Sequence, residues 1–191
     1  MTLEAYLAES AGVLRATLDA VPQARMDSAV DAIVGALRRD KPLLVCGNGG
    51  SAADAMHLTG ELVGRFLHER RALKAYSLSG NPSVFTACAN DAGFETVFSR
   101  QVEAYGEEGA VLIGISTSGA SPNVVAAFRQ ARAMEMQTVA FTGEGGGLLA
   151  PLSDHLIAVP SRRTPLIQQA HLCLYHYLCM KIEEGMMEAH L

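Results

Sequence analysis

Residues 45–61 read Val-Cys-Gly-Asn-Gly-Gly-Ser-Ala-Ala-Asp-Ala-Met-His-Leu-Thr-Gly-Glu. An apolar run that ends at Cys46 leads into a glycine-rich turn, and Ser51 then begins a helical pattern as its predicted N-cap. This order puts backbone N–H groups and a helix N-terminus at the end of a buried strand, where proteins commonly bind phosphate. Further along the helix, His57 and Glu61 are four residues apart and share a face. The stretch therefore predicts an enzyme that acts on a small phosphorylated substrate.

Short apolar runs alternate with helical patterns along the rest of the chain. The predicted strands are 43–46, 72–78, 110–115, 138–141 and 156–159, and the predicted helices are 3–20, 22–39, 51–67, 82–89, 95–105, 122–134 and 165–187. Strands that alternate with helices indicate a parallel sheet covered on both faces. We expect an α/β fold with a five-stranded, doubly wound (flavodoxin-like) sheet. It would form one domain over 1–191, with a helical extension at 1–40 and the sheet core and closing helix at 41–187.

Composition limits the classes of protein to which the chain can belong. With 49% hydrophobic and 18% charged residues among 191, it is not disordered, and a net charge of −5 argues against nucleic acid as a partner. It shows neither a signal peptide nor an apolar run of the roughly 20 residues that span a membrane, so we expect a cytoplasmic protein without a membrane partner. The four cysteines have no CxxC spacing, which predicts free and mostly buried thiols.

A second loop of the phosphate-binding type follows the strand predicted at 110–115. It reads Ser-Thr-Ser-Gly-Ala-Ser over residues 116–121, so four hydroxyl groups and a glycine lie between a strand and a helix. Hydroxyl and free N–H groups can bind a phosphate monoester where no lysine is supplied. Helix capping would explain one of these hydroxyl groups but not four. Neither loop contains Gly-Lys-Ser/Thr, which argues against a nucleoside triphosphate as substrate.

Three polar groups each allow a structural and a functional interpretation. His57 and Glu61 form either a solvated i,i+4 pair or two groups of a metal or acid/base site. The closing helix carries a third group, Gln168, Gln169, His171 and His176. His176 interrupts an apolar surface, and Gln168 is eight residues earlier, close to one face. A lone histidine on a core helix is usually structural, but a His/Gln pair in a chain that also has a His/Glu pair raises the chance that all four converge. Asn90-Asp91 is predicted in a loop, either as an Asx turn or as a binder of sugar hydroxyls.

Taken together, the two loops resemble the SIS (sugar isomerase) family over about residues 40–185. Each matching piece is common alone, whereas the combination is specific, and within the family the chain resembles the phosphoheptose isomerases. The matching stretches are 47–51, 54–57, Glu61, Gly64-Arg65, Asn90-Asp91, 98–104, 114–119, Thr142-Gly143, Gly146-Gly147 and the helix from Gln168 to His176.

The resemblance implies an aldose–ketose isomerase that converts D-sedoheptulose 7-phosphate to D-glycero-D-manno-heptose 7-phosphate through an ene-diol. That reaction begins ADP-heptose synthesis for the lipopolysaccharide core. Glu61 and His176 would be catalytic, and one zinc ion per subunit would be held by His57, Glu61, Gln168 and His176. The enzyme would be a homotetramer with sites shared between subunits. The residues implied to bind the sugar phosphate are Asn48, Gly49, Gly50, Ser51, Glu61, Asn90, Asp91, Ser116, Thr117, Ser118, Ser121 and Gln168.

Two non-enzymatic functions compete with this interpretation. A SIS tetramer similar to the DnaA-initiator-associating proteins would serve as a binding scaffold, but such proteins lack the Glu/His pair that Glu61 and His176 provide. A module that senses sugar phosphates would usually be fused to a DNA-binding domain, for which we expect no room here. The chain also departs from the family pattern at Ala52-Ala53, Leu166 and Gln169.

Overall fold

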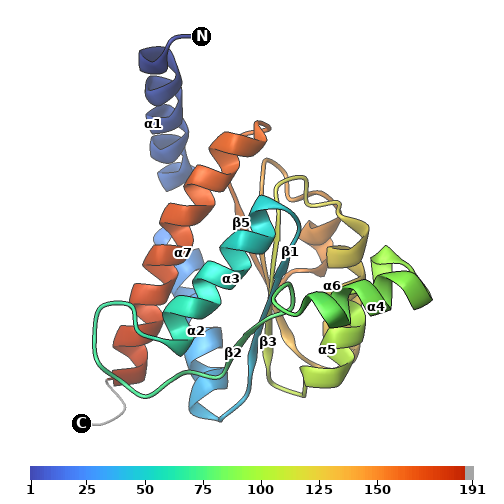
Figure 1. Ribbon diagram of the computed structural model, residues 1–191. Coiled ribbons are helices and arrows are strands. Elements are labelled where there is room, and N and C mark those ends of the chain that lie inside the picture. Colours follow the sequence, from blue (N-terminus) through green and yellow to red (C-terminus); the bar gives the residue numbers. More distant parts are fainter. Residues whose placement is uncertain (188–191) are drawn as a thin grey trace.

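Five parallel strands form the centre of the fold, in the order β2-β1-β3-β4-β5 (Figure 1). The structure is a computed structural model that describes residues 1–187, so the last four residues of the predicted domain lie outside the described part. The order confirms the doubly wound, flavodoxin-like sheet. The strands are β1 (Leu43–Gly47), β2 (Ala75–Ser77), β3 (Val111–Ser116), β4 (Gln137–Thr142) and β5 (His155–Ala158).

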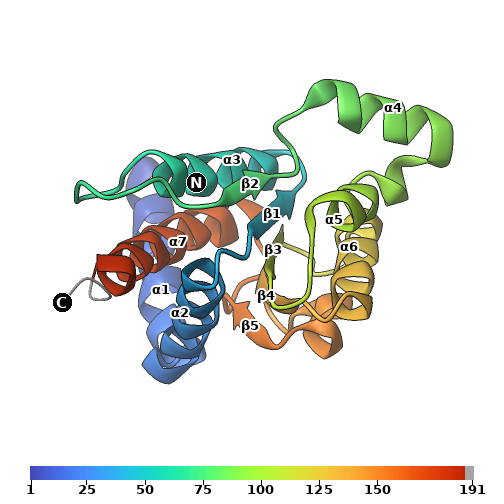
Figure 2. The ribbon, with the colours of Figure 1, turned by 90° about the horizontal axis from the view of Figure 1, so that it is seen from below.

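Helices cover both faces of the sheet (Figure 2). Successive strand residues point to opposite faces, so Leu43 and Val45 belong to one hydrophobic cluster while Leu44 and Cys46 belong to another. The first cluster is completed by α2 (Gln23–Arg38), α3 (Gly50–Val63) and α7 (Thr164–Met187). The second is completed largely by α5 (Ser99–Tyr105) and α6 (Pro122–Ala133). Side chains on both faces of β1 and β3 are therefore buried. This packing holds in place the ends of the two strands, which lead into the glycine-rich and serine-rich loops.

Two helices lie at the periphery. The first, α1 (Leu3–Ala20), buries only Thr17, and its N-terminal half extends beyond the rest of the molecule in Figure 1. The second, α4 (Pro82–Ala92), projects beyond the helices α5 and α6 in Figure 2 and has no buried residue. The remaining elements are the short 3-10 helices η1 (Phe94–Thr96) and η2 (Gly147–Leu152).

Several predicted boundaries are wrong, each for a local reason. The helix predicted over 51–67 ends at Val63, because the next turns of chain donate to a buried carboxylate instead of continuing the helix. The strand predicted over 72–78 shrinks to Ala75–Ser77, which pairs with β1 at the sheet edge. The helix predicted over 95–105 divides into η1 and α5.

Within residues 1–187, no helix is long and apolar enough to span a membrane. All four cysteines are free, as predicted. Only Cys46 and Cys179 are buried, however, while Cys88 is half-buried and Cys173 is exposed. The expectation of mostly buried thiols therefore holds for two of the four.

Candidate active site

The two phosphate-type loops meet where the order of the strands reverses. The neighbours of β1 in the sheet are β2 on one edge and β3 on the other. The chain therefore runs from β1 to β2 in one direction across the sheet and continues from β3 to β5 in the opposite direction. The loops that follow β1 and β3 therefore flank a topological switch point at the carboxyl ends of two adjacent strands. Ligands of doubly wound folds bind in this position.

The glycine-rich loop at 47–50 turns directly into α3. Gly49 has φ of +56°, and α3 begins at Gly50, so the prediction of Ser51 as N-cap is wrong. Ser51 instead lies buried in the first helical turn, where its N–H donates to the carbonyl of Asn48 at 3.0 Å. A Cβ at position 50 would lie 2.6 Å from Nε2 of Gln168, so a larger residue there would displace that side-chain amide. Gln168 thus lies against the start of α3.

The serine-rich loop at 116–121 gathers three hydroxyl groups. Oγ of Ser116 lies 2.9 Å from Oγ of Ser121 and 3.5 Å from Oγ of Ser118. The backbone carbonyl of Thr117 accepts a hydrogen bond from the N–H of Gly143 at 3.0 Å, which ties the loop to the end of β4. Gly119 has φ of +63° and lies so close to Gly146 that no side chain would fit. Contacts with Gly143 and Gly146 therefore determine the conformation of the loop, which does more than cap α6.

A pair of asparagines links the two loops, and sequence reasoning missed one of them. Asn123, in the first turn of α6, is only 1% exposed. Its Nδ2 donates to Oδ1 of Asn48 at 2.9 Å, and Nδ2 of Asn48 donates to Oδ1 of Asn123 at 2.8 Å. No sequence pattern marks Asn123, since an asparagine near a helix start is common. The bridge fixes the glycine-rich loop relative to the serine-rich one.

Three of the four predicted metal ligands converge. One ligand atom each from His57, Glu61 and His176 lie within 4.8 Å of one another. The helices α3 and α7 run side by side in Figure 1, and contacts between Gly50 and Gln168, then between the His57 and His176 rings, fix their register. The His57 and His176 ring centroids are 5.1 Å apart. Gln168 was also predicted as a ligand, and it lies nearer the start of α3.

The contacts inside this group leave one nitrogen without a partner among the described residues. Nε2 of His57 lies 3.0 Å from Oε1 of Glu61, a distance at which a neutral imidazole can donate its N–H to the carboxylate. Nε2 of His176 is buried and has no hydrogen-bond partner in the described part of the chain. A buried, unpartnered imidazole nitrogen is costly unless a ligand occupies it. The donor set of two histidines and one glutamate fits zinc.

Behind His57 lies a second layer that the sequence did not indicate. The Tyr175 hydroxyl is 2.9 Å from Nδ1 of His57 and 3.4 Å from Oδ1 of Asp54. Burial raises the pKa of Asp54, although the hydrogen bond from Tyr175 and the charge of His57 oppose this. Burial also raises the pKa of Tyr175, and the nearby Asp54 adds to the effect. Tyr175 thus stays a neutral phenol.

Two other polar groups of the prediction lie elsewhere. His171 is fully buried, its Nε2 lies 3.1 Å from the carbonyl oxygen of Thr142, and burial lowers its pKa to about 4, so this histidine is structural. Asn90 and Asp91 were predicted in a loop, which is wrong: they form part of the last turn of α4 and are exposed. The helix continues to Ala92 because the chain is alanine-rich until Gly93, whose φ is +90°.

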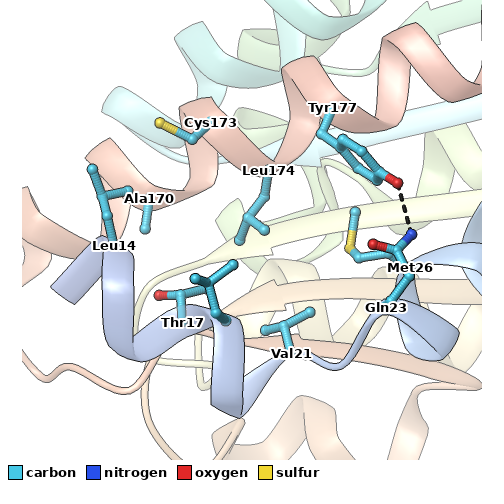
Figure 3. A pocket seen from close by; sticks show the side chains of 10 residues that line it. Leu14, Thr17, Val21, Gln23, Met26, Ala170, Cys173, Leu174 and Tyr177 are labelled. Atoms are coloured by element: carbon cyan, nitrogen blue, oxygen red, sulfur yellow. Dashed lines mark hydrogen bonds between the residues drawn. The ribbon is translucent and has the colours of Figure 1, made fainter. Parts of the chain in front are cut away.

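An apolar pocket of about 390 Å³ lies away from this chemistry (Figure 3). It is formed where α1 and α2 meet α7, and Figure 3 shows Leu14, Val21 and Leu174 pointing into it. The hydroxyl of Tyr177 is held by Gln23 at its edge, at 2.7 Å. Without carboxylate or imidazole groups in its lining, this pocket is not a candidate for catalysis.

Comparisons with known proteins find relatives that match most of the chain. A family model described as SIS domain matches residues 5–143. The chain is 47% identical over 180 residues to the phosphoheptose isomerase of Burkholderia pseudomallei, covering 94% of this chain and 91% of that one. A solved phosphoheptose isomerase from Francisella tularensis superposes with a TM-score of 0.92 at 36% identity, covering 96% of this chain and 100% of that one. One from Neisseria gonorrhoeae gives 0.89 at 39% identity, covering 95% and 97%.

Proposed function

The chain belongs to the SIS domain family, and on that premise we propose that it isomerises D-sedoheptulose 7-phosphate to D-glycero-D-manno-heptose 7-phosphate. The observation that carries the proposal is the convergence of His57, Glu61 and His176 beside two loops of the phosphate-binding type. Relatives that align along most of the chain are named phosphoheptose isomerase. A scaffold without catalysis would have no use for this group, so that alternative is not favoured.

The loops supply the phosphate site in this proposal. The hydroxyl groups of Ser116 and Ser121 already lie 2.9 Å apart, and the first turns of α3 and α6 offer backbone N–H groups at the same edge of the sheet. Asn48, Gly49, Gly50, Asn90 and Asp91 would contact the sugar chain. The residues proposed to bind phosphate are Ser51, Ser116, Thr117, Ser118 and Ser121.

Glu61 and His176 perform the proton transfers. The Glu61 carboxylate removes a proton from C1 of the ketose, and an ene-diol forms when His176 protonates the carbonyl oxygen at C2. His176 then takes the proton from the hydroxyl at C1, and the carbon-bound proton is returned to C2, which gives the aldose. Such positioned acid/base groups contribute about 10²–10⁴-fold each.

We propose that His57, Glu61, Gln168 and His176 hold one zinc ion per subunit. The fit rests on the buried, unpartnered Nε2 of His176 and on the close approach of His57 to Glu61. A bound zinc ion would supply Lewis acidity toward the substrate carbonyl. Gln168 would complete the set from α7, two helical turns before His176.

We also propose that the enzyme is a cytoplasmic homotetramer with sites shared between subunits, which starts the synthesis of ADP-heptose for lipopolysaccharide. Support for assembly comes from α1, where Leu3, Leu7 and Leu18 are 72%, 57% and 73% exposed. They lie on one side of the helix, as in a coiled-coil seam. Residues 1–40 would then be an extension of a single domain over 1–191 that joins subunits.

The reaction itself can be tested directly. Purified protein is incubated with sedoheptulose 7-phosphate, and product is detected through a heptose-7-phosphate kinase. We expect product with the wild type, a loss of at least about 10²-fold with Glu61→Gln, and wild-type turnover with Glu69→Gln, whose side chain is 84% exposed. Absence of product from folded wild-type protein would overturn the proposal. Full activity of Glu61→Gln would remove Glu61 as the base.

A further inference from the structure

Two residues that the proposed reaction does not use stand directly behind His57. Tyr175 is fully buried, and its hydroxyl lies 2.9 Å from Nδ1 of His57. The same hydroxyl donates to Oδ1 of Asp54 at 3.4 Å. Asp54 and His57 lie three residues apart on α3, whereas Tyr175 comes from α7. The contact therefore crosses the interface between the two helices that carry the candidate metal ligands.

The chemistry of imidazole requires a hydrogen-bond acceptor at Nδ1 of His57 when its Nε2 binds a metal ion. A histidine binds a metal through a nitrogen that carries no proton, and the other nitrogen then carries the proton and needs an acceptor. In His57, Nε2 is the atom that faces Glu61, at 3.0 Å, so Nδ1 would carry the proton when Nε2 binds a cation. The nearest acceptor is the Tyr175 oxygen.

A phenol suits this position because it can accept and donate at once. When it accepts from Nδ1 of His57, its own proton points to Asp54, whose carboxylate ends the chain of hydrogen bonds. In a metal-free protein the same hydroxyl can reverse and donate to Nδ1, while Nε2 donates to Glu61. Phenylalanine could do neither.

We propose that Tyr175, backed by Asp54, is a positioning residue that holds His57 as the Nδ1–H tautomer and presents its Nε2 lone pair to a metal ion shared with Glu61 and His176. This inference rests on the metal centre of the proposed function. It assigns no part in proton transfer to Tyr175 or Asp54. Outer partners of this kind typically contribute 10- to 100-fold to metal affinity.

The test is a zinc titration of metal-free full-length protein against a chromophoric chelator. We expect Tyr175→Phe to bind zinc about 10- to 100-fold more weakly than the wild type. The matched control is Tyr177→Phe, which loses a hydroxyl from the same helix that contacts Gln23 instead of His57, and it should bind like the wild type. Asp54→Ala should weaken binding, and Asp54→Asn, whose amide oxygen still accepts from Tyr175, should restore most of it.

A second readout is the tautomer itself. In zinc-loaded wild type, long-range proton–nitrogen spectra should show His57, assigned with His57→Gln, protonated at Nδ1. Equal zinc affinity of Tyr175→Phe and the wild type, or a proton on Nε2, would overturn the inference and leave the metal centre intact. Failure of the wild type to bind zinc would refute both. If Tyr175→Phe does not fold, the comparison of Asp54→Ala with Asp54→Asn decides the matter.

Discussion

The side chains of Asn48 and Asn123 hydrogen-bond to each other in both directions, at 2.8 and 2.9 Å. One follows β1 and the other begins α6, so this single pair joins the two loops on either side of the switch point. Oδ1 of Asn123 also accepts from the N–H of Val124 at 3.0 Å, which fixes the rotamer of its amide. The spacing between the two loops therefore depends on the buried side chain of Asn123.

Removing that bridge should weaken substrate binding. Asn123→Ala leaves the Asn48 amide without its partner, at a cost of about 1–3 kcal/mol. We expect KM for sedoheptulose 7-phosphate to rise about tenfold, with a smaller change in kcat. Gln130→Ala, on the same helix, serves as the control for steady-state kinetics. An unchanged KM in Asn123→Ala would mean that the loops hold their spacing without the pair.

Removing a hydroxyl group from the serine-rich loop should weaken binding of the substrate's phosphate group. Ser116→Ala removes a group that lies 2.9 Å from Oγ of Ser121, and hydrogen bonds to charged groups contribute about 1.5–3 kcal/mol each. We expect KM to rise at least tenfold and competitive inhibition by inorganic phosphate to weaken in parallel. Ser153→Ala, whose hydroxyl donates to the carbonyl of Leu149 instead, should leave inhibition by phosphate unchanged.

Glu183 should contribute far more than Glu184 to the free energy of unfolding. It is 0% exposed and accepts from the N–H groups of Phe66, Leu67 and His68 at 3.0, 2.7 and 2.9 Å. Its Oε1 also lies 3.2 Å from Nε of Arg70. Because breaking a buried pair is expensive, we expect Glu183→Gln to lose about 3 kcal/mol in urea unfolding at pH 7.

The control for this substitution is Glu184→Gln. Glu184 forms a half-buried ion pair with Lys181 at the surface, and its loss should cost under about 0.5 kcal/mol. Burial opposes ionisation of Glu183, but the three N–H donors and Arg70 prevail and lower its pKa below the usual 4.5. Its contribution is therefore present above pH 4.5 and is lost as the pH falls through the lowered value. The gap between wild type and Glu183→Gln should narrow in acid, and a constant gap would contradict this account.

His171 should make stability depend on pH over a different range. Burial lowers its pKa from 6.5 to about 4, so the unfolded chain binds a proton before the folded one does. Stability from this group is complete above pH 6.5 and is lost as the pH falls toward 4, an effect of about 3 kcal/mol. His171→Gln should flatten that slope in urea unfolding, whereas His68→Gln, at an exposed position, should keep it.

The exposed leucines of α1 should control assembly. Leu7→Glu puts a charge on the side of the helix that also carries Leu3 and Leu18, and we expect a smaller particle by light scattering after gel filtration. Ala16→Glu, exposed on the opposite side of α1, should leave the mass unchanged. An unaltered mass for Leu7→Glu would exclude this stripe as the contact between subunits.

Features that depend on local periodicity could be predicted from the amino-acid sequence. Alternation of apolar runs with helical patterns was enough for the parallel sheet, and a helical period of 3.6 residues was enough to put His57 and Glu61 on one face. The two loops were also predictable, because glycine and serine after a strand favour a turn and the start of a helix. Boundaries failed where tertiary contacts decide, as at Val63, after which the chain turns to reach Glu183.

The contacts between separate helices could not be predicted in this way. The register of α3 against α7 brings His176 to His57, although the two lie more than a hundred residues apart. It also turns Tyr175, which the apolar period marks as ordinary core, into the hydrogen-bond partner of His57. Likewise, Asn123 meets Asn48 only because β1 and β3 are neighbours. Such contacts depend on packing across the whole core, which no window of sequence contains.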